Sequence, residues 1–488
     1  MYRRDIAWFI CCLSLLLVFA GGQAVASNSS PDSFVEAEYQ LFLPVTVNRF
    51  PLKTTFGMQM ALYEVDEGYS YLEDLQSSFI RYGLEWDAVE PIQGDRLWSE
   101  LATLEDGLLR ASQARLQSLL IIHGTPIWGR TIENAKCSRI RTEYLDAFGD
   151  FLYDAVRRYS YPPYNVMYWE IWNEPDIGYS EDLADALFGC WADYSDETWG
   201  GEYYAEVLQA VYPRIKAANP RAQVIIGGLH LDCDPRPEGN YCAKNGHNEH
   251  APLYLTGILR AGGGDYFDGV GFHAYDYFHY WLPELGRYSN YHWGSGWDTS
   301  GPVLNAKASY IRQVLDEFGV SGKFLMNTEG SLICGPIDDW DFDEGCESAE
   351  DSLYEQTKAR YVTQLYASAI ASDLRANVWY NMFGYRHAEL VDQHDFSLRP
   401  AYFSYRFARQ LLADASFQRE IEMDTQVRIY EFQVEGRQIW VVWSLNGENR
   451  AIALDEMPNI MYDYMGNALT PTNPLMVSLD PLYLVWTP

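Results

Sequence analysis

Residues 166–176 read VMYWEIWNEPD, and this stretch shows the pattern on which the fold prediction rests. It begins with the short apolar run Val166–Trp172, which has the length and composition of a buried β-strand. Pro175 lacks a backbone N–H and restricts the residue before it, so we expect the strand to stop at Glu174. A carboxylate is therefore expected at the rim of a buried sheet.

Seven further apolar segments are predicted to be strands, and segments with helical spacing of apolar residues lie between them. The predicted strands are Thr55–Tyr63, Ser78–Tyr82, Ser118–His123, Gln223–Leu229, Gly269–His273, Lys323–Thr328 and Ala376–Asn381. The helix after the third strand places Leu145, Phe148 and Leu152 on one face. Eight strand-then-helix units indicate a parallel sheet covered by helices. We predict an α/β fold, a (β/α)8 TIM barrel over residues 53–412.

The pattern changes near residue 413, where polar and apolar residues begin to alternate with a period of two. Strands are expected at Gln426–Val434, Arg437–Ser444, Asn449–Leu454, Leu475–Leu479 and Leu482–Trp486. Alternation of this kind is typical of antiparallel strands with one buried face. We predict a small antiparallel, β-sandwich-like module over residues 413–488, which packs on the barrel and does not catalyse.

The N-terminus has the three parts of a secretory signal peptide. Arg3 and Arg4 form a positive region, and Ile6–Ala20 is an apolar segment too short to span a bilayer. Residues 24–26 read AVA, a cleavage site of small residues. We predict a signal peptide over residues 1–26, a leader or stalk over residues 27–52, and a secreted or cell-surface-associated protein. An uncleaved membrane anchor is the alternative.

Composition and charge narrow the class of partner. Hydrophobic residues make up 48% of the chain, which is enough for a large core and excludes a disordered protein. The formal net charge is −33, and the chain has no basic stripe that would neutralise phosphates. We therefore expect no nucleic-acid partner.

The cysteines predict disulfides. Eight are present, and Cys11 and Cys12 lie in the predicted signal peptide, which leaves an even number for an oxidising compartment. Proximity favours the pairs Cys233–Cys242 and Cys334–Cys346, which leaves Cys137–Cys190, although other pairings are possible. Each of these cysteines follows a predicted strand, so we expect all of them in loops at one end of the barrel. A zinc site is the alternative, but the chain has no C-x-x-C pair.

The carboxyl ends of the strands carry the active site in barrels of this kind. The predicted ends carry Arg81, His123, Asn173, Glu174, His273, Tyr275, Glu329 and Trp379. Two carboxylates from different strands suit glycosidic hydrolysis, in which one protonates the leaving oxygen and the other attacks the sugar or activates water. Glu170 competes with Glu174, but at ~3.3 Å per residue it lies about 13 Å deeper, so we interpret it as a buried hydrogen-bonding residue.

Two motifs resemble those of clan A glycoside hydrolases: WNEP at residues 172–175 and TEG at residues 328–330. The chain is most similar to the xylosidase and iduronidase family, glycoside hydrolase family 39, and to neighbouring families. The resemblance implies a retaining mechanism in which Glu174 is the acid/base and Glu329 is the nucleophile. It also implies that Asn173 holds the 2-hydroxyl group of the sugar.

Arg81 and Tyr275 are expected to support this pair by stabilising the negative charge of Glu329. That charge, together with burial, is expected to raise the pKa of Glu174 so that it can act as an acid.

Other residues are expected to bind the sugar. His123 and His273 are predicted to line the site, although structural histidines fit the pattern equally well. Trp379 is expected to cover the apolar C–H face of a sugar, with core packing as the alternative. Exposed aromatic residues for further sugar subsites are expected in loops at Trp128, Trp191, Trp199, Trp293 and Trp297.

No metal ion or cofactor is predicted. Metal-dependent barrel hydrolases commonly carry His-x-His at the end of the first strand, whereas residues 54–60 read TTFGMQM. The acidic stretch Asp338–Asp351 has carboxylates that suit calcium but lacks the EF-hand spacing, so a solvated loop is favoured. We therefore expect hydrolysis of β-glycosidic bonds in an oligosaccharide or polysaccharide. The alternatives are a non-catalytic carbohydrate-binding barrel of the cell surface and a purely structural surface protein.

Overall fold

The computed structural model describes residues 55–61, 65–193, 195–236, 251–279, 287–290, 297, 299–334, 346 and 352–487. The predicted signal peptide, the leader, Cys242, Trp293 and, apart from Cys346, the stretch Asp338–Asp351 lie outside these described residues. Leu52–Pro488 forms one compact unit. Among the described helices, none is both long enough and apolar enough to cross a membrane.

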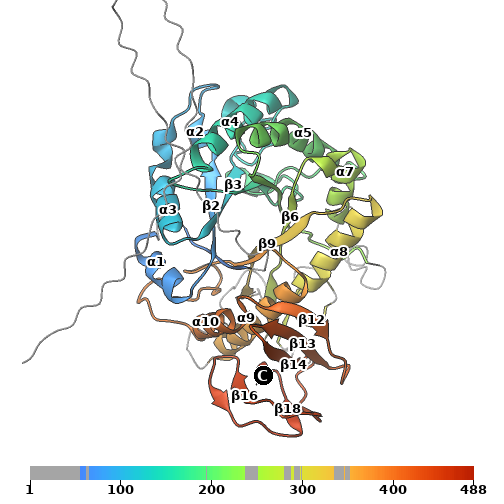
Figure 1. The fold of residues 1–488 in the computed structure, drawn as a ribbon. Helices are drawn as coiled ribbons and strands as arrows, with labels where there is room; N and C mark the ends of the chain where they lie inside the picture. The colour runs from blue at the N-terminus through green and yellow to red at the C-terminus, as the bar shows by residue number, and fades with distance from the viewer. Residues whose placement is uncertain are drawn as a thin grey trace, which may run out of the picture. The chain divides into compact units, whose positions relative to one another are not determined.

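Eight parallel strands form a closed barrel in the order β1-β11-β9-β6-β5-β4-β3-β2 (Figure 1). They are β1 Thr55–Gln59, β2 Phe79–Glu85, β3 Gln117–His123, β4 Tyr168–Asn173, β5 Gln223–Leu229, β6 Gly269–His273, β9 Phe324–Gly330 and β11 Ala376–Trp379. Each lies where a strand is predicted, and the predicted barrel is confirmed. The strands are largely apolar on both faces because side chains fill the interior and helices cover the outside.

Helices follow the barrel strands and lie on the outside of the barrel (Figure 1). They are α1 Val65–Asp74, α2 Trp86–Val89, α3 Ala102–Gln113, α4 Leu145–Tyr159, α5 Gly201–Ala218, α7 Tyr254–Arg260, α8 Leu304–Glu317, α9 Leu353–Ala371 and α10 Pro400–Leu412. Leu145, Phe148 and Leu152 of α4 are buried, as their spacing predicts.

The barrel interior is filled in layers. One apolar cluster contains Phe79, Leu119, Tyr168, Ile225, Met326, Ala376 and Val378. Arg81, Glu170 and Thr328 lie two residues further along three of these strands, and side chains two apart share a face. The polar residues therefore form a layer above the apolar cluster, toward the carboxyl ends of the strands, and the site rests on a packed floor.

Two antiparallel sheets follow α10, and the predicted β module is confirmed. One sheet has the order β12-β13-β14-β19-β16-β17, and the other pairs β15 with β18. The strands are β12 Ser416–Glu420, β13 Val427–Val434, β14 Arg437–Ser444, β15 Arg450–Ile452, β16 Ile460–Asp463, β17 Ala468–Leu469, β18 Leu475–Val477 and β19 Leu482–Trp486. The pattern does not predict β12, β16 and β17, because exposed or half-buried residues dominate them.

Helix α9 links the barrel to the six-stranded sheet. Most of its residues are buried, which is typical of a helix covered on more than one side. Tyr483 of β19 donates to Thr363 of α9 at 3.1 Å, and Asn305 of α8 donates to Tyr430 of β13 at 2.8 Å. The module therefore packs on the helices that follow the sixth and seventh barrel strands.

A small sheet extends two barrel strands, and the sequence pattern does not predict it. It contains β7 Asp276–Phe278, β8 Tyr288–Ser289 and β10 Leu332–Cys334. β7 follows β6, β10 follows β9, and the two extensions pair in parallel. The pairing of β7 with β10 holds together the segments that carry Tyr275 and Glu329.

Two of the predicted disulfides, Cys137–Cys190 and Cys334–Cys346, are confirmed, with Cα–Cα distances of 5.5 Å and 6.0 Å. The predicted pair Cys233–Cys242 includes a residue outside the described ranges. The prediction that every cysteine lies in a loop is wrong for Cys334, which ends β10. The reason is that the chain continues as a paired strand beyond the barrel wall.

Candidate active site

Glu174 follows the last residue of β4, where the backbone leaves the barrel wall. Trp172 and Glu174 have φ angles of 72° and 47°, a left-handed conformation that is uncommon for residues other than glycine. The Trp172 ring is fully buried and stacks on Trp191 at 4.3 Å, which supports the strained turn. The Glu174 carboxylate is therefore presented at the carboxyl end of its strand.

Glu329 lies in β9 at an irregularity in the pairing with β6. Phe272 pairs with Asn327, whereas the next residue, His273, pairs with Glu329. The extra residue on β9 is a β-bulge, a feature that redirects side chains next to functional sites. The bulge brings Glu329, which is only 8% exposed, beside His273.

Arg81 is the cation at the centre of the site and is almost fully buried in the middle of β2. Its guanidinium donates to Glu170 Oε2 at 2.8 Å and to Glu329 Oε1 at 2.5 Å. It also donates to Gln59 Oε1 at 2.8 Å and to Asn173 Oδ1 at 3.1 Å. Burial lowers the pKa of Arg81, but the two carboxylates raise it by more, so the guanidinium stays charged. The predicted support of Glu329 by Arg81 is present as an ion pair.

Tyr275 provides the second contact to Glu329. Its hydroxyl donates to Glu329 Oε2 at 2.8 Å, as predicted. Burial and the charge of Glu329 raise the pKa of Tyr275 well above its usual value, so the phenol keeps the proton that it donates.

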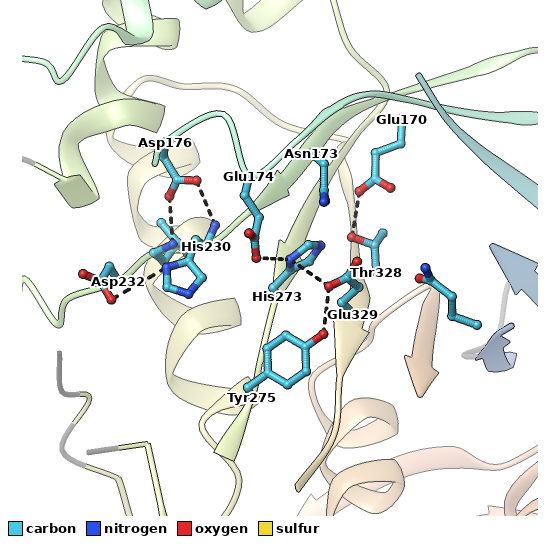
Figure 2. A network of polar contacts seen from close by, with 12 residues as sticks. Glu170, Asn173, Glu174, Asp176, His230, Asp232, His273, Tyr275, Thr328 and Glu329 are labelled. Carbon is cyan, nitrogen blue, oxygen red and sulfur yellow. Dashed lines mark hydrogen bonds and ion pairs between the residues drawn. The ribbon is translucent and has the colours of Figure 1, made fainter. Parts of the chain in front are cut away.

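His273 lies between the two candidate catalytic carboxylates (Figure 2). Its Nδ1 is 2.7 Å from Glu174 Oε1 and 3.5 Å from Glu329 Oε2. One ligand atom of each of these residues, a carboxylate oxygen or a ring nitrogen, lies within 4.8 Å of the other two. The structure thus brings the predicted pair together around one imidazole ring.

The pKa of Glu174 differs from the sequence-based expectation. Burial raises it, but the hydrogen bond and charge of His273, with smaller effects from His230 and Arg81, bring it down to about 2. Burial lowers the pKa of His273, but the charge of Glu329 and the hydrogen bond with Glu174 raise it by more. These shifts favour the shared proton on His273, opposite to the sequence-based expectation of a raised pKa for Glu174.

Glu170 is fully buried and accepts hydrogen bonds, as interpreted from the sequence. Its carboxylate pairs with Arg81 and accepts from the Thr328 hydroxyl at 2.7 Å. Arg81 contacts both carboxylates, so Glu170 belongs to the charge network of the site. The sequence-based interpretation did not foresee that Glu170 shares this cation with Glu329.

His123 and Asn173 end β3 and β4, as predicted. His123 Nδ1 lies 3.0 Å from the Leu187 carbonyl oxygen, and burial lowers the pKa of this histidine to about 4. Its imidazole is therefore neutral. Asn173 is partly exposed and accepts from Arg81 through its side-chain oxygen. Contact of either residue with a sugar stays a prediction.

Trp379 is fully buried at the end of β11. Its indole N–H donates to the Ala388 carbonyl at 2.9 Å, and its ring packs near Tyr361. This environment corresponds to core packing, the alternative role considered for Trp379. Contact between Trp379 and a sugar also stays a prediction.

The expectation of exposed loop tryptophans is wrong for three of the five residues. Trp191, Trp199 and Trp297 are buried. Their indole N–H groups donate to the carbonyls of Cys137 (3.1 Å), Asp176 (2.7 Å) and Leu231 (2.8 Å), respectively. Trp128 is half-buried and donates to the Glu90 carbonyl. The sequence does not predict which loop tryptophans are buried. A tryptophan that packs inside a loop and one that contacts a ligand occur in the same kind of sequence.

The site extends past Glu174 to residues that sequence reasoning missed (Figure 2). His230 follows β5, and its Nδ1 lies 3.7 Å from Asp232. A pocket is lined by His230, Asp232, Tyr275, Tyr277, Asn290 and Lys307. Lys307 of α8 donates to the carbonyls of His230 and His273, and burial lowers its pKa to about 8. His230 directly follows β5, so a search of the carboxyl ends of the strands would have identified it. No local sequence pattern distinguishes Lys307 on the outer helix α8.

The trio Glu174, His273 and Glu329 consists of residue types that bind metal ions. It fits an ion poorly, because the Arg81 guanidinium already lies 2.5 Å from Glu329 and would repel a second cation. His273 also directs Nδ1 at Glu174. The arrangement suits acid–base and nucleophilic chemistry.

No protein-family model matches the sequence, and neither does any curated protein. Solved structures do match. A family 39 glycoside hydrolase from Bacteroides cellulosilyticus WH2 has a TM-score of 0.64 at 17% identity, over 89% of this chain and 81% of that chain. A GH30 endoxylanase from Clostridium papyrosolvens C71 has a TM-score of 0.56 at 12% identity, over 89% and 97%. A family 30 subfamily 8 xylanase from Clostridium acetobutylicum has a TM-score of 0.54 at 11% identity, over 88% and 95%.

The structural neighbours thus include clan A glycoside hydrolases of families 39 and 30, and the chain has a glycosidase fold. At these identities the likeness establishes the fold alone. Activity has to be argued from the site.

Proposed function

We propose that this protein is a retaining glycoside hydrolase that cleaves β-glycosidic bonds in an oligosaccharide or polysaccharide. The observation that carries the proposal is that carboxylate oxygens of Glu174 and Glu329 lie within 4.8 Å of each other. A retaining mechanism uses carboxyl groups about 5–5.5 Å apart, whereas an inverting one needs roughly 6.5–9.5 Å to admit a water molecule. The short separation supports direct attack of one carboxylate on the sugar.

Glu329 is the proposed nucleophile, because Arg81 and Tyr275 stabilise its ionised form. Its oxygen attacks the anomeric carbon and forms a glycosyl ester while the bond to the leaving oxygen breaks. Glu174 gives a proton to that oxygen. In the second step Glu174 takes a proton from the water that hydrolyses the ester.

His273 supplies the proton that Glu174 needs for the first step. The charge of Glu329 helps to hold this proton on the imidazole of the free protein. Esterification removes that charge, so the imidazolium loses stabilisation as the reaction proceeds. The proton then passes across the 2.7 Å hydrogen bond to Glu174 and on to the leaving oxygen. When the ester is hydrolysed, the charge returns and the proton is again favoured on His273.

The proposal is tested by screening aryl β-glycosides and polysaccharides and by following the anomer of the first-formed sugar with NMR. We expect hydrolysis with unchanged anomeric configuration. An inverted first product would contradict the retaining mechanism. Binding of a polysaccharide without any hydrolysis would favour the non-catalytic alternative.

We also propose that the protein acts outside the cytoplasm. The two disulfides within the described residues are of the kind that persists in oxidising compartments, and the N-terminal sequence reads as a signal peptide. Sequencing of the exported protein is expected to give Ser27 as the first residue. Recovery of the protein only from the cytoplasmic fraction would contradict this.

A further inference from the structure

We propose that Tyr385 forms an aromatic subsite beside Glu329, which binds the apolar C–H face of a sugar ring. The proposal rests on the proposed function, because it assigns a substrate contact to that same site. Neither the motifs nor the strand-end residues point to Tyr385.

The Tyr385 ring is exposed and lies next to the catalytic groups. Its side chain is 47% exposed, and its ring centroid is 4.9 Å from that of Tyr380 and 6.4 Å from that of Tyr275. Tyr275 in turn donates to Glu329 at 2.8 Å. An exposed aromatic surface therefore begins one residue away from the proposed nucleophile.

The backbone that carries Tyr385 is strained. Gly384, Tyr385, Arg386 and His387 have φ angles of 72°, 61°, 50° and 62°. Only glycine adopts such values without a steric penalty, so three of these four residues are held in an unfavourable conformation. Strain of this kind persists only where the surroundings impose it, and it is concentrated at functional sites.

A buried lysine holds one end of this strained run. Lys358 of α9 is fully buried, and it donates to the carbonyls of His387 at 2.8 Å and Glu389 at 2.9 Å. Its third interaction is with Glu355 at 2.9 Å. The Tyr354 hydroxyl donates to the same His387 carbonyl at 2.7 Å. Helix α9 thus uses a buried charge to fix the backbone two residues after Tyr385.

Further contacts hold the segment from Gly384 to Ala388 against the small sheet and the barrel. Arg386 donates to the Cys334 carbonyl at 2.6 Å, and the Cys334 N–H donates to the Arg386 carbonyl at 3.0 Å. Cys334 is itself held in a disulfide with Cys346. The Trp379 indole donates to the Ala388 carbonyl. Trp379 therefore acts as a positioning residue for the loop that presents Tyr385.

The chemistry of the position favours a sugar ring as the ligand. An aromatic ring covers the C–H face of a sugar, while polar groups nearby bind the hydroxyls. Tyr385 lies beside Tyr275, whose hydroxyl contacts Glu329. A sugar bound for attack by Glu329 would therefore lie next to the exposed ring of Tyr385.

The test measures affinity in the full-length Glu329→Gln variant, which should bind without turnover. Xylohexaose, cellohexaose, mannohexaose, arabinohexaose and an oligomer of a uronic acid are titrated by calorimetry. For the sugar that binds, adding Tyr385→Ala is expected to weaken the affinity about tenfold, whereas Tyr385→Phe keeps the ring and changes it less than about threefold. Tyr153→Ala is the matched control, because Tyr153 is an exposed tyrosine on the outer helix α4.

The outcomes separate this subsite from the proposed function. Equal affinities with tyrosine and alanine at position 385 would overturn the subsite, and so would failure of every oligosaccharide to bind. Equal loss in Tyr385→Ala and Tyr385→Phe would show a hydroxyl contact and overturn the stacking role. Tight, Tyr385-dependent binding of a sugar that the wild-type protein does not hydrolyse would support the subsite while contradicting the proposed hydrolysis.

Discussion

Glu174 and His273 share one proton, and the charge of Glu329 favours its location on the imidazole. Burial alone would disfavour a charged histidine, but two carboxylates within 3.5 Å of Nδ1 outweigh it. The pair therefore releases its proton at the raised pKa of the histidine. In the proposed mechanism, loss of this proton at alkaline pH removes the acid for the first step.

His273→Gln is expected to move the alkaline limb of the kcat/KM profile to lower pH. In the wild-type protein this limb should lie above the ordinary histidine pKa of about 6.5, because the pKa of His273 is raised. In the variant only the carboxyl group of Glu174 can carry the proton. The pH dependence of kcat/KM on an aryl glycoside measures the shift, with the exposed His394→Gln as the control. An unchanged alkaline limb would mean that His273 does not hold the proton.

Glu174→Ala is expected to separate leaving groups by their need for protonation. Substrates with poor leaving groups should be hydrolysed about 10²–10⁴-fold more slowly, whereas activated aryl glycosides should lose far less in their first step. Glu329→Ala should abolish hydrolysis of both substrates. Added azide should restore activity to Glu329→Ala with inverted configuration, which NMR and steady-state rates detect. Equal losses for both leaving groups in Glu174→Ala would contradict its role as the acid.

Arg81→Met is expected to lower the free energy of unfolding by roughly 3–5 kcal/mol, because Glu170 and Glu329 would lose their shared buried cation. Denaturant unfolding measures this change. Arg110→Met is the matched control, because it removes an exposed pair with Asp106 that contributes about 0.3–0.5 kcal/mol. Adding Glu170→Gln to Arg81→Met should restore part of the loss. A loss for Arg81→Met as small as for Arg110→Met would contradict the proposed network.

Strand β7 is tied to two helices by a buried carboxyl group. Asp276 accepts from the Tyr361 hydroxyl of α9 at 2.8 Å and from the Val303 N–H, just before α8, at 3.1 Å. Burial raises its pKa to about 7, although these hydrogen bonds and the charge of Lys307 oppose the shift. Between the unfolded value of about 3.9 and this raised value, the native state binds more protons than the unfolded state. The Asp276 contribution to the free energy of unfolding therefore falls as the pH rises through this window.

Asp276→Asn is expected to remove that dependence. Relative to the wild-type protein, the variant should gain stability on the order of 1–4 kcal/mol between about pH 4 and about pH 7. Urea unfolding at several pH values measures the difference. The control is Asp146→Asn, because Asp146 is exposed. A constant difference between Asp276→Asn and wild type across this range would show that folding does not raise the pKa of Asp276.

The positions of the eight barrel strands were predictable because they depend on local signals. A short apolar run followed by a helical segment identifies a strand wherever it occurs, and β5 and β6 begin and end as predicted. The small sheet β10-β7-β8 has no such signal. Its strands contain two or three residues and exist because β6 and β9 lie side by side and continue past the barrel.

The barrel and the β module share a core. One buried cluster contains barrel and helix residues together with Tyr430, Phe432 and Tyr483 of the module. A barrel truncated after Leu412 would expose the apolar surface of α9 to water. We expect this truncation to lower the thermal unfolding temperature strongly or to make the protein insoluble, whereas a chain that begins at Ser27 and keeps the module should not change. A soluble truncated barrel with unchanged unfolding temperature would contradict the packing role.

The sequence by itself determined the barrel, the antiparallel module and the strand-end positions of Glu174 and Glu329, because periodicity and proline restriction act over a few residues. Tertiary structure decided how those groups ionise. His273 is 99 residues from Glu174, and Arg81 is 248 residues from Glu329, yet each pair is in direct contact. Tertiary contacts between distant residues also decided that three of the loop tryptophans are buried and that Tyr385 is exposed. Ionisation and exposure depend on which distant groups fold against a side chain, and local sequence does not contain that information.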